Sequence, residues 1–137
     1  MNRQVLVTGL LRLTALLPLP LAHAVGACCG WLLWWMPNSA RRIAARNLAL
    51  CYPELPVAGR ERLLRRNLLE TGKLLLELGP LWLWPGERVL ALVRGSVAGE
   101  DALTAAARRK QGAILLTPHL GAWEMAGLYY SSRHPLT

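Results

Sequence analysis

His119 and Glu124 are the two residues whose types and spacing best suit chemistry. A neutral imidazole can take a proton from a hydroxyl near neutral pH. A carboxylate bonded to the second ring nitrogen fixes the tautomer and stabilises the imidazolium that forms. Such a pair would make a hydroxyl nucleophilic. The spacing alone is a weak signal, and a structural histidine at the end of a strand is the alternative interpretation.

The segments around this pair indicate how it is positioned. Residues 112–116 form a short apolar run, which is typical of a buried parallel strand, and Pro118 ends it because proline cannot donate to a sheet ladder. Residues 121–132 are predicted to be a helix. His119 would then lie at the carboxyl end of a strand, where open α/β sheets bind ligands. Glu124 would lie in the first helical turn, where the dipole favours its charge.

Three further segments complete the carboxyl half. Residues 87–93 are predicted to form a short helix or turn, residues 95–97 a short strand, and residues 99–110 a helix. The predicted fold class is therefore α/β, helix-rich and with an incomplete parallel sheet, because two strands are too few for one. We expect residues 37–137 to be the amino-terminal portion of a longer, truncated domain.

The composition separates the first 36 residues from the rest. Hydrophobic residues make up 53% of the 137 and charged residues 18%, which is too apolar for an average soluble domain. The net charge of +8 favours an anionic partner such as lipid phosphate, nucleic acid or an acidic protein. The three cysteines have no metal-binding or redox spacing, so packing is their expected role.

Residues 1–36 are predicted to be a membrane anchor. The segment is almost continuously apolar and ends in a tryptophan cluster of the kind found at bilayer interfaces, Trp31, Trp34 and Trp35. Pro18-Leu19-Pro20 interrupts it, so two arrangements stay open. One is a single kinked transmembrane helix over residues 13–36; the other is a helical hairpin with arms at residues 5–17 and 21–35, partly within one leaflet. A buried pair of soluble helices is the alternative.

Two helices are predicted to follow the anchor. Asn38 or Ser39 caps the first helix, which reaches Leu50. Its arginines directly follow a hydrophobic segment, which predicts that this side of the membrane is cytoplasmic. The second is amphipathic, covers residues 60–78 and is expected to end at Gly79-Pro80. The apolar, tryptophan-rich residues 81–85 would line a core or form a second membrane contact.

The sequence resembles the lipid A biosynthesis acyltransferases, the late lauroyl and myristoyl transferases of Gram-negative bacteria. Residues 46–54, RNLALCYPE, are similar to the family signature R-N-L-x-x-C-F-P-E, with Tyr52 in place of the usual Phe. Glu61-Arg62 and the helix after it resemble the segment that follows that signature. Residues 119–124, HLGAWE, match the catalytic motif H-x4-D/E in its Glu form, with Ala122 where Asn is common. The resemblance covers the whole chain.

The resemblance implies transfer of an acyl chain from an acyl carrier protein thioester to the 3-hydroxyl of an acyl chain on a lipid A precursor. His119 would be the general base and Glu124 would orient it. Gly121, Trp123 and Arg46 are expected to bind substrate, with backbone N–H groups near Gly121 holding the developing oxyanion. No metal or organic cofactor is expected. Membrane lipid is a further expected partner, at the cytoplasmic face of the inner membrane.

Two other functions stay open. A glycerophospholipid-type acyltransferase shares the H-x4-D pattern, although residues 46–54 and Glu124 argue against it. A membrane-associated fragment without catalysis is the second. A nucleic-acid partner is not expected, because the basic residues lie on amphipathic helices beside the anchor and no nucleic-acid-binding motif accompanies them. Acyl chain length, the acylation state of the acceptor and the oligomeric state are left open by the sequence.

Overall fold

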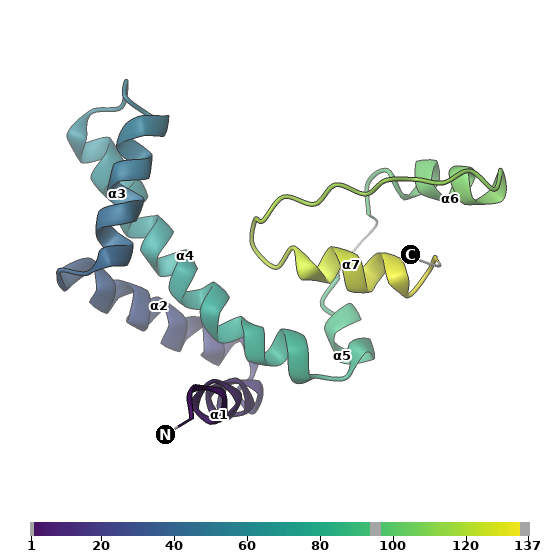
Figure 1. The fold of residues 1–137 in the computed structure, drawn as a ribbon, viewed down its shortest axis with the longest axis horizontal. Helices are drawn as coiled ribbons and strands as arrows, with labels where there is room; N and C mark the ends of the chain where they lie inside the picture. The colour runs from purple at the N-terminus through teal and green to yellow at the C-terminus, as the bar shows by residue number, and fades with distance from the viewer. Residues whose placement is uncertain (1, 94–96, 135–137) are drawn as a thin grey trace. The chain divides into compact units, whose positions relative to one another are not determined.

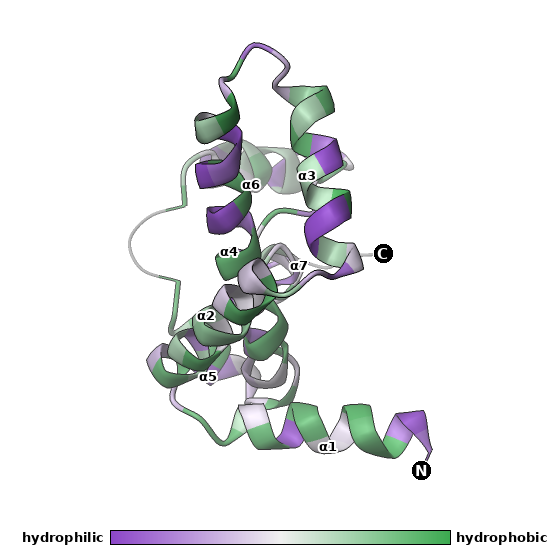
Figure 2. Ribbon diagram, turned by 90° about the vertical axis from the view of Figure 1, so that its left-hand side faces the viewer, coloured by the Kyte–Doolittle hydropathy of each residue, from purple (hydrophilic) through white to green (hydrophobic). Residues whose placement is uncertain are grey.

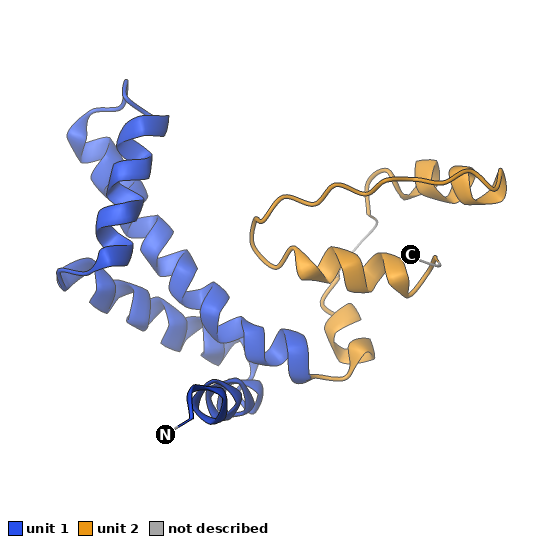
Figure 3. Cartoon of the chain, in the orientation of Figure 1, with its two compact units in different colours: residues 1–83 blue, residues 84–137 orange. Residues whose placement is uncertain are grey.

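The computed structural model describes residues 2–93 and 97–134, and within these ranges all regular secondary structure is α-helical (Figure 1). The helices are α1 (Arg3–Ala15), α2 (Leu19–Trp35), α3 (Ser39–Cys51), α4 (Val57–Leu83), α5 (Gly86–Leu90), α6 (Glu100–Arg108) and α7 (Glu124–Ser131). The chain divides into two compact units, residues 1–83 and 84–137 (Figure 3).

Helix α4 organises the first unit, because α1, α2 and α3 all pack against it. The side chains of Leu64 and Leu68 are buried on its apolar stripe, as expected for an amphipathic helix. The prediction of a long helix here is confirmed, but α4 begins three residues earlier and ends five residues later than residues 60–78.

Glycines let the backbones of α2 and α4 touch. A Cβ atom added to Gly26 of α2 would lie 2.5 Å from the carbonyl oxygen of Gly72 in α4. A Cβ atom on Gly72 would overlap the carbonyl oxygen of Gly26 and lie 2.9 Å from the nitrogen of Gly30. Real Cβ atoms do not approach backbone this closely, so any larger residue at these three positions would push the helices apart.

The prediction that Gly79-Pro80 ends the helix is wrong, because α4 continues through both residues to Leu83. Gly79 lies directly against α1, where an added Cβ atom would meet the hydroxyl of Thr14 and the carbonyl oxygen of Leu11. Both Gly79 and Pro80 are buried. Proline removes one helical hydrogen bond, and the burial of this turn against α1 offsets that loss.

One ionisable pair also joins α2 to α4. The Nε2 atom of His23 lies 2.7 Å from a carboxylate oxygen of Glu77, and both side chains are partly buried. His23 interrupts an apolar helix, and a buried polar group is tolerated when it has such a partner.

The single kinked helix considered for residues 13–36 is wrong. Helix α1 ends at Ala15 and α2 begins at Leu19, with Pro18 as its N-cap residue, so the helices follow the two arms of the predicted hairpin. Proline suits the first turn of a helix and so starts α2 rather than bending it. Among the described residues no single helix is long and apolar enough to cross a bilayer; only α2 and α3 taken together are, and an 80° bend separates them.

Helix α3 begins as predicted. The side chain of Asn38 accepts a hydrogen bond of 2.8 Å from the backbone N–H of Arg41, which satisfies a free donor of the first turn. After α3, the guanidinium of Arg60 donates to the carbonyl oxygens of Leu55 at 2.6 Å and Pro53 at 3.1 Å. Arg60 thus folds the proline-containing loop against the start of α4.

The predicted α/β fold is wrong for the part of the chain that the structure describes, because residues 2–93 and 97–134 contain no strand. Residues 112–116 form an extended loop, in which the side chains of Ile114 and Leu116 are each 90% exposed. A strand is stable only when a neighbouring strand pairs with its backbone, and an apolar run alone does not supply one. The predicted strand at residues 95–97 falls mostly outside the described residues.

Helix α6 ends at a backbone conformation that glycine would adopt more easily. Lys110 has a φ of 55°, the N–H of Gln111 donates to the carbonyl of Ala106, and that of Lys110 donates to the carbonyl of Ala107, which is the Schellman arrangement. A side chain strains this left-handed conformation.

We therefore expect Lys110→Gly to raise the free energy of unfolding by about 0.5–1 kcal/mol. Arg109→Gly is the matched control, because Arg109 has a φ of −81° and gains no relief from glycine. Chemical unfolding followed by circular dichroism measures both changes. Equal effects of the two substitutions would contradict the strain at Lys110.

Candidate active site

His119 lies on an exposed loop just before α7. The N–H of Leu120 donates to the carbonyl oxygen of Pro118 at 2.7 Å, and Gly121 has a φ of 57°, so the chain turns sharply at His119 and again at Gly121. The ring of His119 packs against the indole of Trp123, with 4.4 Å between ring centroids and 55° between their planes. This turn presents the imidazole to solvent beside a large aromatic surface.

Glu124 is the first residue of α7 and is half-buried. The prediction that it lies in the first helical turn is confirmed, although the helix starts three residues later than predicted. A carboxylate is stabilised at this position by the helix dipole. The tight turn at Gly121 separates it from His119, so the two residues lie on either side of one loop-to-helix junction.

An apolar pocket of about 400 Å³ adjoins His119 through Trp123. It lies between the extended loop and one face of α7, and its lining residues are Ala113, Ile114, Leu115, Thr117, Trp123, Ala126, Gly127 and Tyr130. Its size falls within the range of small-molecule sites, about 300–1,000 Å³. Sequence reasoning assigned residues 113–115 to a strand and missed this pocket.

A polar cluster fixes α7 against α6. The hydroxyl of Tyr129 donates to a carboxylate oxygen of Glu100 at 2.9 Å, and the Nε atom of Arg133 lies 3.1 Å from the other oxygen. The guanidinium of Arg133 also lies over the Tyr129 ring, 4.0 Å from its centroid. This cluster holds the helix that carries Glu124 and one wall of the pocket.

Burial, together with the hydrogen bond to Glu100, raises the pKa of Tyr129 above its ordinary value of 10.0. The unfolded chain therefore loses this phenolic proton first. The stability that neutral Tyr129 contributes is complete below pH 10 and declines as the pH rises through the raised pKa.

We expect Tyr129→Phe to reduce the alkaline loss of stability, measured as the difference in unfolding free energy between about pH 9 and about pH 11. An unchanged difference would contradict this.

Four of the five predicted site residues, namely His119, Gly121, Trp123 and Glu124, lie within residues 119–124 of the second unit, and the ring contact of His119 with Trp123 joins two of them. Arg46 lies on α3 in the first unit, so its part in the site stays a prediction. A groove of about 390 Å³ lies between α3 and α4, and its polar lining residues include Asn47, Asn67 and Thr71.

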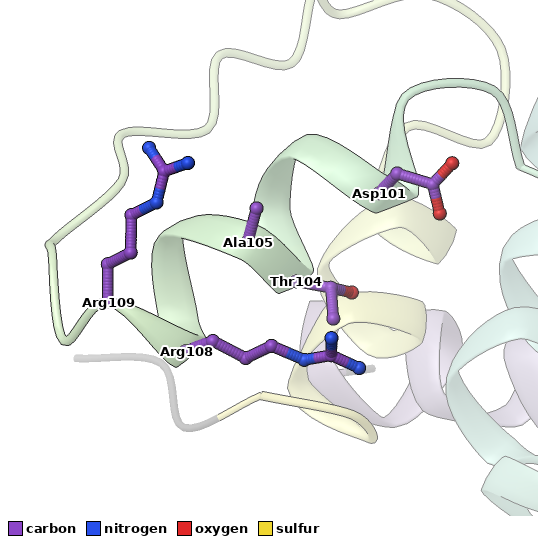
Figure 4. A pocket seen from close by; sticks show the side chains of 5 residues that line it. All are labelled: Asp101, Thr104, Ala105, Arg108 and Arg109. Carbon is purple, nitrogen blue, oxygen red and sulfur yellow. The ribbon is translucent and has the colours of Figure 1, made fainter.

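A further pocket, of about 370 Å³, lies along α6 and is lined by Asp101, Thr104, Ala105, Arg108 and Arg109. Figure 4 shows that the side chains of Arg108 and Arg109 extend in different directions. They therefore do not converge on one anion as a phosphate site requires. Within the described residues, no group of three His, Cys, Asp or Glu side chains is placed to hold a metal ion.

The sequence is similar to those of known proteins. A family model described as bacterial lipid A biosynthesis acyltransferase matches residues 2–137. A lipid A biosynthesis acyltransferase of Haemophilus influenzae is 32% identical over 121 residues, which cover 87% of this chain and 38% of that protein. From Escherichia coli, a lauroyltransferase is 28% identical (93% of this chain, 41% of that protein) and a palmitoleoyltransferase is 30% identical (87% and 38%).

The chain spans about two fifths of the length of these relatives. No solved structure matches it. The family match covers the RNLALCYPE segment and the junction that carries His119 and Glu124. These are the two segments from which the sequence predicts the same family. The chain therefore belongs to the bacterial lipid A biosynthesis acyltransferases.

Proposed function

We propose that the protein transfers a fatty acyl chain from an acyl carrier protein thioester to a hydroxyl of a lipid A precursor at the cytoplasmic face of the inner membrane. The observation that carries this proposal is the exposed His119 imidazole, which packs on Trp123, a lining residue of an apolar pocket. A pocket of this lining suits an alkyl chain, and an accessible imidazole beside it suits proton transfer.

In the proposed reaction His119 takes the proton of the acceptor hydroxyl as its oxygen attacks the thioester carbonyl carbon. The tetrahedral intermediate then expels the carrier thiolate, an ester bond forms, and the imidazolium returns its proton to the sulfur. Glu124 would stabilise the imidazolium and orient the ring. Backbone N–H groups near Gly121 would hold the oxyanion. These steps need no cofactor or metal.

The membrane location is supported by the apolar surface of α1 and α2. Figure 2 shows that both helices are mainly hydrophobic. Large apolar side chains stay exposed along them, among them Leu6, Leu10, Leu13, Leu16, Trp31, Leu32 and Trp35. Exposed apolar patches of this kind mark membrane or partner contacts. We propose that these helices lie in the bilayer interface, with the arginines of α3 near anionic headgroups.

Replacing one such arginine should weaken binding to lipid. Arg42 is exposed on α3, and a cation near an anionic surface contributes about 1 kcal/mol. We expect Arg42→Gln to lower binding to phosphatidylglycerol-containing vesicles about fivefold, measured by flotation. Vesicles of neutral lipid are the control. Equal loss on both kinds of vesicle would contradict a role for the charge.

Purified protein, as its gene encodes it, tests the function when it is mixed with lauroyl acyl carrier protein and a lipid A precursor. The expected product is an ester at the 3-hydroxyl of an acceptor acyl chain, identified by mass spectrometry. An acceptor without that hydroxyl is the matched control and should gain nothing. Absence of product, or equal acylation of the control acceptor, would refute the proposed reaction.

A further inference from the structure

We propose that Gly127, on the face of α7 that lines the apolar pocket, sets the longest donor acyl chain that the enzyme accepts. This inference rests on the proposed function and adds a specificity-determining residue to it. Gly127 contributes no side chain to the wall it forms. A Cβ atom added there would meet no atom within 4 Å, so the space in front of this residue is open.

The chemistry of the lining identifies the ligand as an alkyl chain. Ile114, Leu115 and Ala126 supply aliphatic surface, and Tyr130 and Trp123 supply aromatic surface. An alkyl chain is recognised through contact with such surface rather than through hydrogen bonds. Each methylene that the pocket buries contributes a roughly constant free energy, and a methylene beyond the end of the pocket contributes none. The depth of the pocket therefore decides which chain length fits.

The acyl groups for which two relatives are named favour the donor chain over the chain of the acceptor as the occupant of this pocket. Trp123 lines the pocket and also packs on His119, so one side chain connects the pocket to the proposed base. The thioester carbonyl must lie within reach of the hydroxyl that His119 activates, and the donor chain extends directly from that carbonyl. Two relatives of this chain are named for different acyl groups, lauroyl and palmitoleoyl. A chain-length determinant is therefore needed in this family.

The test is a competition assay with an equimolar mixture of saturated acyl carrier protein donors of graded chain length. We compare kcat/KM for the longest accepted donor with kcat/KM for a donor four carbons shorter. We expect Gly127→Leu to lower the ratio of the first value to the second by about tenfold or more. Gly127→Ala should give a smaller shift in the same direction. Alanine also favours the helix, so this variant tests the inference even if Gly127→Leu does not fold.

Gly9→Leu is the matched control, because an added Cβ atom at Gly9 also meets no atom within 4 Å, and Gly9 lies on α1 in the other unit. It should leave the chain-length profile unchanged. An unchanged profile in both Gly127 variants, with activity that still depends on His119, would overturn the role of Gly127 and leave the proposed function standing. A profile that changes with the acceptor chain instead would overturn the assignment to the donor. Wild-type activity that does not depend on His119 would refute the proposed function itself.

Discussion

Replacing His119 by Ala is expected to lower kcat for acyl transfer by about 10²- to 10⁴-fold, the usual contribution of a positioned general base. The imidazole is exposed and lies next to an apolar pocket, so its removal takes away the proton acceptor without opening a cavity in a core. The protein should stay folded, because its buried apolar side chains, such as Leu68 and Val89, lie elsewhere.

Two further variants separate chemistry from packing. His119→Phe keeps an aromatic ring for Trp123 to pack against but cannot accept a proton, so it should lose as much activity as His119→Ala. His134→Ala makes the same substitution in the same unit, beyond the end of α7, and should keep near wild-type activity. Initial rates with purified protein measure all three. Activity retained in His119→Phe would show that the ring matters for packing alone.

Gly72→Leu is expected to lower the free energy of unfolding by about 3 kcal/mol or more, at the upper end of overpacking effects. A side chain at Gly72 would meet the backbone of Gly26 and Gly30, which cannot rotate away as a flexible side chain could. Helices α2 and α4 would have to separate. The contact between His23 and Glu77, which joins the same two helices, would be lost with it.

Gly9→Leu again provides the control, because it introduces the same side chain into α1 where the space is open. It should change stability by less than about 1 kcal/mol. Chemical unfolding of the protein in detergent, followed by far-ultraviolet circular dichroism, compares the two variants. Similar stabilities for Gly72→Leu and wild type would show that α2 and α4 are not in backbone contact.

Local signals in the sequence predicted most of the helices. Asn38 supplies the side-chain acceptor that begins α3, and Pro18 separates α1 from α2. Each of these depends on groups only a few residues apart, which is why the sequence is sufficient to locate them.

Features that depend on distant parts of the chain were not predictable in this way. The apolar run at residues 112–116 has the composition of a strand, but pairing needs a second strand that the described chain does not provide. Gly79-Pro80 has the composition of a helix end, but packing on α1 keeps it helical. The pocket lined by Trp123 forms only where the extended loop meets α7, so no local sequence pattern predicts it.

The most direct test of His119 as the base on the acceptor compares two acceptors that differ in one atom. An acceptor with a 3-amino group in place of the 3-hydroxyl is partly a neutral amine at alkaline pH, with a fraction that grows as the pH approaches the amine pKa of about 10, and this fraction attacks without first losing a proton. We predict that His119→Ala lowers transfer to the hydroxyl acceptor about 100-fold or more and transfer to the amine acceptor less than about tenfold. Equal losses with both acceptors would contradict the role of His119 as the general base.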